Sequence, residues 1–555
     1  MSTARAADRT QFVHLTGGQA LVAALRAQGV DAVFGLPGVQ LDFAFDALYE
    51  ARNAIAVYHT RHEQAVSYMA DAYARTTGRP GVCLTVPGPG VLNAAAGLST
   101  AYACSSPVLC LTGQVPSRDI GRGRGMLHEV NNQLGALRSV TKWVARVDRP
   151  DAAPAVIAEA FRHMLTGRPR PVAVEVPPDV LEAVQDVAPP ERVDVQAVRP
   201  DPDVVARAAA PLGRAERPLI VAGGGVTRAA AWGPLRELAA MLEAPVVATE
   251  NAKGAVSDRH YLGQNTVAGQ ELVPASDVIL IAGTRFRQPA GSDWGPKPGQ
   301  TLIQLDVDPE EIGRNCAVAV GIVADAAEGL AALVDAVPRH NRARASREEE
   351  LTALKARARV RLESIQPQAS YIDAIRAVLP DDGILVGEVT QLAYWANVGY
   401  PVYEPRTYLT AGYQGTLGHG LATALGAQVA APGRKVVSIS GDGGFMYNVQ
   451  ELSTAVRHRL NVVAVVFNDN AFGNVLRTQR EKFGGRVIAS ELTNPDFPRL
   501  AEAFGVDGFR ADSPDALRAA LERALSHDRP ALIEVPIGEV PPARSVVWAG
   551  FRDYW

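Results

Sequence analysis

The chain has 555 residues, of which 47% are hydrophobic and 21% charged, and its formal net charge is −4. This composition excludes a chain that is disordered over most of its length, because disorder needs low hydrophobicity and a high net charge. It also argues against nucleic acid as a partner, since such binding calls for a basic surface. At about 150 residues per domain, the length predicts three or four domains.

The number of cysteines and the length of the apolar runs indicate the cellular compartment in which the chain is expected. Four scattered cysteines, Cys83, Cys104, Cys110 and Cys316, predict buried thiols in a reducing environment rather than a disulfide framework or a zinc site. No run of 18 apolar residues occurs, so no transmembrane helix and no membrane partner are expected. The first 16 residues lack the apolar core of a signal peptide, and we therefore expect a cytoplasmic protein.

Short β-branched runs alternate along the chain with Ala- and Leu-rich stretches, which is typical of βαβ units and parallel sheets. Two stretches of different composition, at residues 177–203 and 338–368, separate three such blocks. We predict an α/β fold with three doubly wound parallel-sheet domains. The first is expected at residues 12–180, a central one at 200–338 and a third at 369–540.

Each block contains several apolar segments that predict buried strands. In the first block these are residues 32–34, 54–59, 81–86 and 107–112, with helices expected at 17–28 and 63–77. In the second block they are residues 219–221, 246–248, 278–282 and 302–305. In the third they are residues 383–385, 435–440, 462–467 and 531–535, with a helix at 448–458.

Two polar clusters follow neighbouring strands of the third block. Gly441-Asp442-Gly443-Gly444 comes after one strand, and Asn468-Asp469-Asn470 comes after the next. The carboxyl ends of parallel strands meet at one sheet edge, where ligands bind. The glycines permit close backbone approach, and a helix starting after Gly444 would offer N–H groups to an anion. Because two carboxylates repel each other without a cation, the pattern predicts a Mg²⁺–diphosphate site.

This succession of strand, Gly-Asp-Gly, helix, strand and Asn-Asp resembles the thiamine diphosphate motif. Residues 12–540 resemble the enzymes of 2-oxo-acid metabolism typified by acetolactate synthase, benzoylformate decarboxylase and pyruvate oxidase. The resemblance implies pyrimidine-binding, central and diphosphate-binding domains, with thiamine diphosphate and Mg²⁺ as cofactors. It implies that Asp442, Asp469 and the carbonyl of Ala471 hold the metal ion, although Asn is more usual at the Asp469 position. It also implies cofactor contacts at Gly441, Gly443, Gly444, Phe472 and Gly473.

A second stretch, Arg61-His62-Glu63-Gln64 followed by Pro87-Gly88-Pro89-Gly90, resembles the pyrimidine-domain signature. The resemblance makes Glu63 the glutamate that activates the cofactor. Its carboxyl would hydrogen-bond a ring nitrogen, so that the cofactor's exocyclic amine, as an imine, removes the thiazolium proton. The residues alone also fit a first-turn acid that the helix dipole favours. The two motifs together favour catalysis.

The stretch Leu409–Gly418 resembles the loop that holds the aminopyrimidine ring. The resemblance implies that the carbonyl of Gly415 accepts a hydrogen bond from the exocyclic amine. It also makes Leu417 the apolar side chain that bends the cofactor. Without the resemblance, Leu417 would be read as an ordinary core residue.

The resemblance weakens around the substrate. Asn474 stands where acetolactate synthases have Met, and Thr478 stands where they have Trp. His128 occupies the position of a usual Gln, and Gln114 resembles a Gln near the cofactor. Asn474 and His128 are candidate polar groups near the reacting carbon, and each equally fits a role in loop hydrogen bonding.

We therefore expect an enzyme that makes or breaks a carbon–carbon bond beside a carbonyl group. Its substrate would be a small 2-oxo acid or 2-hydroxy ketone, and it would act as a carboligase, decarboxylase, lyase or transferase. A 2-hydroxyacyl-CoA lyase or oxalyl-CoA decarboxylase is the alternative, with Gly223–Gly225 and the basic Arg285, Arg287 and Lys297 as a nucleotide site. The three basic residues fit ordinary surface charges better than a nucleotide site. A non-catalytic diphosphate-binding scaffold is a remote alternative.

Three further expectations concern cofactor, assembly and tail. FAD is not expected, because residues 263–269 lack the Gly-Met-His-Gly segment of FAD-containing synthases. The resemblance implies a homodimer or homotetramer. Four aromatic side chains lie within residues 548–555, and we expect this tail to pack over the active-site entrance, on a partner subunit or on its own domain.

Overall fold

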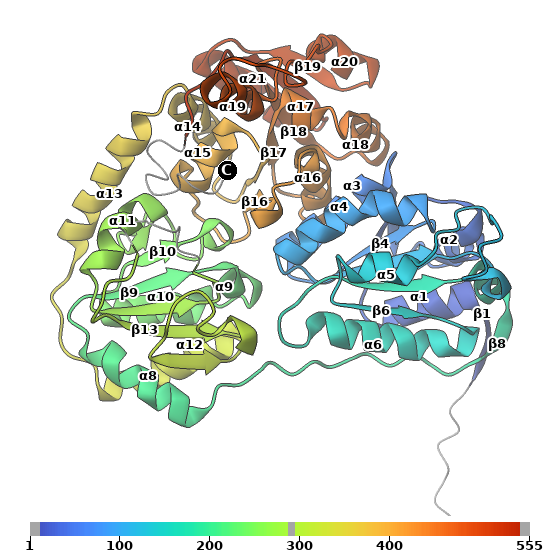
Figure 1. Ribbon diagram of the computed structural model, residues 1–555, viewed down its shortest axis with the longest axis horizontal. Helices are drawn as coiled ribbons and strands as arrows, with labels where there is room; N and C mark the ends of the chain where they lie inside the picture. The colour runs from blue at the N-terminus through green and yellow to red at the C-terminus, as the bar shows by residue number, and fades with distance from the viewer. Residues whose placement is uncertain (1–11, 287–294, 544–555) are drawn as a thin grey trace, which may run out of the picture. The chain divides into compact units, whose positions relative to one another are not determined.

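The computed structural model describes residues 12–286 and 295–543 (Figure 1). The chain separates into two compact units, one of Met1–Ala74 with Arg79–Gln196 and one of Arg75–Gly78 with Ala197–Trp555. The first unit contains one six-stranded parallel sheet and the second contains two. The predicted α/β class with three parallel sheets is therefore confirmed. Strands β1 (Val13–Thr16) and β8 (Val184–Val187) form a separate antiparallel pair.

The sheet of the first unit is covered by helices on both faces (Figure 1). Val82 and Leu84 pack into a core with helices α1 (Gly17–Ala27) and α6 (Ala153–Leu165). Helices α3 (Glu63–Thr77) and α4 (Pro89–Ala103) lie over the other face. In sheet order the strands are β3 (Ala56–His59), β2 (Ala32–Gly35), β4 (Gly81–Thr85), β5 (Val108–Gly113), β7 (Val172–Val176) and β6 (Trp143–Arg146).

The first sheet of the second unit has the strand order of doubly wound dinucleotide-binding folds, 3-2-1-4-5-6 along the chain. Its strands are β11 (Gly263–Gln264), β10 (Val246–Ala248), β9 (Pro218–Ala222), β12 (Val278–Ala282), β13 (Thr301–Asp306) and β14 (Val320–Val323). Its helices are α8 (Pro202–Arg214), α9 (Gly224–Arg228), α10 (Trp232–Leu242), α11 (Thr266–Ala275) and α12 (Ala326–Ala336).

The second sheet of that unit is the third along the chain and is called the third sheet below. It repeats the strand order of the first unit's sheet, 2-1-3-4-6-5 along the chain. Its strands are β16 (Tyr408–Thr410), β15 (Ile384–Gly387), β17 (Val436–Gly441), β18 (Val462–Asn468), β20 (Ala531–Pro536) and β19 (Asp507–Arg510). From β15 the chain adds β16 on one side of it, and the later strands β17 and β18 are added on its other side, so the direction in which strands are added reverses between β15 and β17. In open α/β sheets, ligands bind at the carboxyl ends of strands at such a switch point. Its helices include α14 (Gln368–Val378), α15 (Gln391–Gly399), α16 (His419–Ala430), α19 (Gly473–Lys482), α20 (Phe497–Ala503) and α21 (Pro514–Ser526).

One predicted helix of the third block is preceded by a short helix that the sequence did not predict. The helix predicted at residues 448–458 is present as a 3₁₀ turn at Val449–Glu451 that continues into α18 (Leu452–His458), and a separate one-turn helix, α17 (Asp442–Phe445), precedes it. Asn448 lies between α17 and this 3₁₀ turn, and its side-chain amide donates to the carbonyl of Gly418. The stretch of different composition at residues 338–368 contains α13 (Glu348–Glu363), which buries one stripe of Leu and Ala side chains.

The expectations about cysteines and membrane spans can be compared with the described residues. Cys83 and Cys110 are buried, Cys104 and Cys316 are half-buried, and all four are free thiols. Within residues 12–286 and 295–543, no helix combines the length and apolar character needed to cross a bilayer.

The contact between α3 and α4 leaves no room for a side chain at Gly97. A Cβ there would lie 2.2 Å from the Ser67 hydroxyl oxygen and 2.8 Å from the backbone nitrogen of Tyr68. We predict that Gly97→Ala forces the helices apart and destabilises the chain by about 1–3 kcal/mol. Denaturant unfolding followed by circular dichroism measures this, with Ser99→Ala in the same helix as the control. Equal midpoints for the two variants would contradict the packing described.

Candidate active site

Two carboxyl groups meet at the edge formed by β17 and β18. The strands run in parallel with Gly441 opposite Phe467, so Asp442 and Asp469 each follow directly at the carboxyl end. Their side chains lie close enough for each to shift the pKa of the other. Asp442 is buried, and Asp469 accepts a hydrogen bond from the backbone N–H of Ala471 at 3.2 Å. The structure thus brings together the residues that the sequence placed at one rim.

This proximity changes how readily the pair ionises. Burial raises the pKa of Asp469 to about 6, and the charge of Asp442 adds to the rise. Burial also raises the pKa of Asp442, while a hydrogen bond from Asn494 acts in the opposite direction. Two partly desolvated carboxyl groups in contact need a shared proton or a cation between them. The edge is therefore suited to a divalent ion.

Asn494 is a member of this cluster that the sequence analysis did not select. Its Nδ2 lies 2.6 Å from Oδ2 of Asp442, 3.0 Å from Oδ1 of Asn468 and 3.2 Å from Oδ1 of Asn470. The Asn468 amide donates to Glu534 at 2.8 Å, which turns its oxygen toward Asn494. An Asn-Pro pair signals only a turn, so nothing in the local sequence marks Asn494 as a site residue.

The glycines of the motif differ in what surrounds them. A Cβ on Gly441 would meet only a Thr390 carbon at 3.9 Å, and one on Gly415 would meet nothing within 4 Å. A Cβ on Gly443 would instead lie 2.6 Å from the Phe472 ring, and one on Gly444 would lie 2.0 Å from Oε1 of Glu388. The backbone at Gly441 and Gly415 therefore has open space beside it that a ligand could occupy, whereas Gly443 and Gly444 are in close contact with the Phe472 and Glu388 side chains.

These features fit a metal-bound diphosphate. Mg²⁺ takes oxygen ligands and is typically held by one or two carboxylates together with phosphate oxygens and water. Among the described residues, no group of three His, Cys, Asp or Glu side chains gathers around one point. The two carboxylates of Asp442 and Asp469 would thus need backbone, amide or ligand oxygens to complete the coordination. Because α17 is only one turn long, an anion at this edge would be bound by its backbone N–H groups rather than by the dipole of a long helix.

The loop before α16 contains three glycines with positive φ, the first of which is Gly412 with φ 58°. Gly415 has φ 60° and Gly418 has φ 85°. Leu417 is half-buried rather than enclosed, which differs from an ordinary core residue and leaves part of its side chain able to contact a ligand.

In the first unit, Glu63 is the first residue of α3 and is only 9% exposed. Asn93, on α4, donates its side-chain N–H to Oε2 of Glu63 at 3.0 Å. A Cβ on Gly90 would lie 3.5 Å from the other carboxyl oxygen, so the glycine keeps space beside it. Asn93 was not among the predicted site residues, because one helix-borne Asn carries no distinctive sequence signal.

Gln114 and His128 lie in hydrogen-bond networks of the first unit. The Gln114 amide is buried and donates to Oε2 of Glu175 at 2.9 Å, and Arg146 bonds the other oxygen of that carboxyl at 2.6 Å. His128 has a left-handed backbone with φ 66°, and its Nδ1 lies 3.1 Å from Oε1 of Gln40. His128 is thus paired with Gln40, while the Gln114 side chain is turned into the Glu175 network.

Asn474 lies at the start of α19 and accepts a hydrogen bond from Gln391 at 2.5 Å. Gln391 in turn accepts one from the backbone N–H of Ala543 at 2.9 Å, and Arg477 donates to the carbonyl of Val540 at 2.6 Å. These contacts hold the segment that leads to the aromatic tail. The tail itself, residues 548–555, and Arg287 lie outside the described residues.

The glycine-rich loop after β9 is packed internally. A Cβ on Gly223 would lie 2.3 Å from Thr284, and one on Gly225 would lie 2.7 Å from the Cα of Gly283. Arg285 lies over the Tyr413 ring at 4.7 Å and near Glu311. The glycines of this loop thus permit close contact between chain segments.

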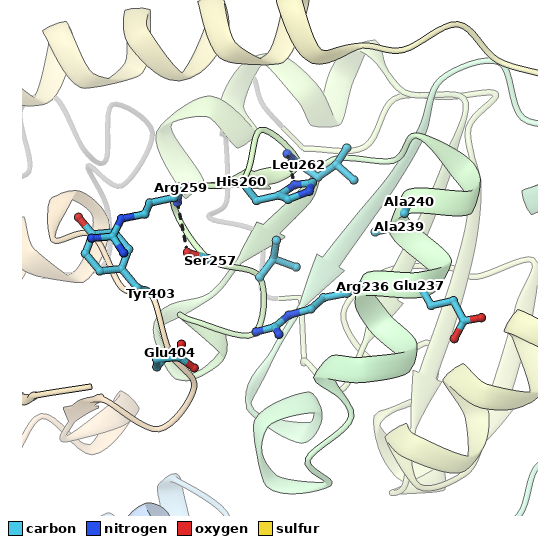
Figure 2. A pocket seen from close by; sticks show the side chains of 11 residues that line it. Arg236, Glu237, Ala239, Ala240, Ser257, Arg259, His260, Leu262, Tyr403 and Glu404 are labelled. Carbon is cyan, nitrogen blue, oxygen red and sulfur yellow. Dashed lines mark hydrogen bonds between the residues drawn. The ribbon is translucent and has the colours of Figure 1, made fainter. Parts of the chain in front are cut away.

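A hollow of about 520 Å³ lies elsewhere in the second unit, beside α10 (Figure 2). Its basic groups are engaged by the protein: Arg259 stacks on Tyr403 at 3.7 Å and pairs with Asp381, and Arg236 donates to the carbonyl of Ala255 at 2.7 Å. None of the site residues predicted from the sequence lines it.

The raised pKa of Asp469 predicts a pH effect on stability. The folded chain binds more protons than the unfolded one between pH 3.8 and about 6, so the stability contributed by this group falls as pH rises through that range. We predict that metal-free Asp469→Asn loses less stability on going from pH 4 to 7 than the wild type, and that Mg²⁺ raises its melting temperature less. Thermal unfolding measures both effects. Asp528→Asn, an exposed acid, is the control, and identical pH profiles for Asp469→Asn and the wild type would contradict the account.

Comparison with known proteins gives three family matches that together cover most of the chain. Residues 15–136 match the N-terminal TPP binding domain of thiamine pyrophosphate enzymes, residues 205–333 their central domain, and residues 388–535 their C-terminal TPP binding domain.

Curated relatives align over nearly the full length. A probable acetolactate synthase large subunit of Methanocaldococcus jannaschii is 34% identical, over 94% of this chain and 92% of that protein. The acetolactate synthase isozyme 2 large subunit of Escherichia coli (strain K12) is 35% identical, over 96% and 98%. A probable 2-ketoarginine decarboxylase of Pseudomonas aeruginosa is 34% identical, over 94% of each chain.

Proposed function

The chain belongs to the family of thiamine pyrophosphate enzymes and resembles acetolactate synthases, and from this we propose a Mg²⁺-dependent enzyme that joins or cleaves carbon–carbon bonds of 2-oxo acids or 2-hydroxy ketones. The observation that carries the proposal is the contact between Asp442 and Asp469 beside the open backbone of Gly441. Thiamine diphosphate, when bound, supplies a nucleophilic carbon and an electron sink for this chemistry.

In this proposal the third sheet binds the diphosphate end of the cofactor. Asp442, Asp469 and the backbone carbonyl of Ala471 would hold Mg²⁺. The Gly441–Gly444 turn would receive phosphate oxygens at its backbone N–H groups, and Phe472 and Gly473 would complete the wall of the site. Asn494 would keep Asp442 oriented through the 2.6 Å hydrogen bond.

Glu63 would hold and move a proton at the pyrimidine end. Its Oε2 is occupied by Asn93, which leaves Oε1 for a ring nitrogen of the ligand. A carboxyl group at that nitrogen can exchange a proton with it, which is general acid–base catalysis. The carbonyl of Gly415 would accept from the exocyclic amine, and the partly exposed Leu417 would support the ring.

His128, Gln114 and Asn474 remain the proposed residues near the substrate. His128 with Gln40 offers a polar pair, whereas the hydrogen bonds of Gln114 and Asn474 support positioning roles. Simple decarboxylation of a 2-oxo acid is a second candidate, since a relative at 34% identity is named as a probable decarboxylase. The internal packing of Gly223 and Gly225 favours both of these functions over the CoA alternative.

We further propose a cytoplasmic homodimer or homotetramer, and its mass in solution measures the assembly. The expectation that FAD is absent stays a prediction, which the visible absorbance of the purified protein tests.

Glu63→Gln is predicted to lower turnover by about a hundredfold or more, because the amide cannot exchange the proton. Binding of thiamine diphosphate with Mg²⁺ should change little, since the diphosphate contacts are intact. Steady-state kinetics and titration calorimetry measure the two quantities, with exposed Glu159→Gln as the matched control. Wild-type turnover in Glu63→Gln would contradict the assigned role.

The reaction itself is tested with a panel of 2-oxo acids, with and without a second 2-oxo acid or an aldehyde as acceptor, and mass-spectrometric product detection. We predict loss of carbon dioxide from at least one 2-oxo acid, and a 2-hydroxy ketone or 2-hydroxy-2-alkyl-3-oxo acid when an acceptor is present. Turnover of acyl-CoA substrates alone would favour the CoA alternative instead.

A further inference from the structure

Glu388 is a buried carboxyl at the switch point of the third sheet. It follows β15 directly, is 2% exposed, and its backbone N–H donates to the carbonyl of Ile439 on β17 at 2.9 Å. Its place in the site depends on β15 and β17 being neighbours in the sheet, so no local sequence pattern marks it. The reaction chemistry proposed above assigns it no role.

The carboxyl holds the loop that ends at Gly418. Oε1 of Glu388 accepts the backbone N–H of Gly418 at 2.6 Å. From the other side, the Asn448 amide donates to the carbonyl of Gly418 at 2.6 Å. Gly418 has φ 85° and precedes the first turn of α16, so two side chains fix a residue whose backbone is otherwise adaptable.

The same carboxyl lies against the Gly441–Gly444 turn. A Cβ on Gly444 would lie 2.0 Å from its Oε1, and a Cβ on Gly420 would lie 2.6 Å from both its Oε2 and the Ser440 hydroxyl. The Glu388 side chain thus fills the space between the start of α16 and the start of α17. Its length determines how closely the Gly415–Gly418 loop and the Gly441–Gly444 turn approach each other.

We propose that Glu388 is a positioning residue that sets the spacing between these two loops, so that one ligand can be held at its heteroaromatic ring by the first and at its diphosphate by the second. This inference rests on the proposed function, which assigns ring and diphosphate to those loops. A shorter side chain at position 388 lets the loops shift relative to each other and disfavours only a ligand that touches both.

The charge of Glu388 is not required for this role. Burial raises the pKa of Glu388 to about 7, so its neutral form is well populated at neutral pH. Gln has the same length and keeps a carbonyl oxygen that can accept the Gly418 N–H. Asp also keeps the acceptor but is one methylene shorter.

The test compares two ligands in the presence of Mg²⁺ by titration calorimetry: thiamine diphosphate, which spans both loops, and inorganic diphosphate, which reaches only one. Glu388→Asp is expected to weaken thiamine diphosphate by about tenfold or more while changing inorganic diphosphate by less than about twofold. Glu388→Gln should stay within about threefold for both ligands. Asp382→Asn, an exposed acid nearby in the chain, is the control and should match the wild type.

Asn448→Ala is a second test that loosens Gly418 from the opposite side, and it decides the matter if Glu388→Asp does not fold. It should produce the same selective loss for thiamine diphosphate. Equal weakening of both ligands, or no weakening of either, would overturn the positioning role while leaving the proposed function intact. A wild-type chain that binds inorganic diphosphate but not thiamine diphosphate would overturn the proposed function, and this inference with it.

Discussion

The carboxyl groups of Asp442 and Asp469 lie together at one sheet edge, and their mutual repulsion is the physical constraint that the candidate site must satisfy. Asp442 and Asp469 cannot both carry a charge at close range in a partly desolvated setting without a compensating cation. Neighbouring side-chain amides orient this pair: the amide of Asn494 donates to Asp442, and it is itself held by a second hydrogen bond to the side-chain oxygen of Asn468. A divalent ion would therefore relieve a repulsion that the fold itself creates, and would bring an anionic ligand to the backbone of Gly441.

Sheet topology explains why this edge is the place where ligands would bind. The first unit's sheet and the third sheet share one strand order, and in both the chain path reverses between the second and third strands of the sheet. Glu388 and the Gly441–Gly444 turn follow the two strands on either side of that reversal, and Glu63 follows an edge strand in the related sheet. Similar sheets thus present different chemistry, an acid cluster in one and a single carboxyl with an amide partner in the other.

The strands and the two motifs could be predicted because their signals are local. The run at residues 462–467 is apolar along its whole length, as a strand covered on both faces must be, and Gly-Asp-Gly directly follows a strand. Glu388, Asn93 and Asn494 could not be found this way, since each acts on a residue at least 30 positions away in sequence. Strand order and long-range pairing decide such contacts.

The most direct measurement is the affinity of the purified chain for thiamine diphosphate, titrated once with Mg²⁺ and once after EDTA treatment. We predict saturable binding with Mg²⁺ and a loss of most of that affinity without it, because the acid pair then repels the diphosphate. Equally tight binding in both conditions, or no binding in either, would contradict the claim that this edge holds a metal-bound diphosphate.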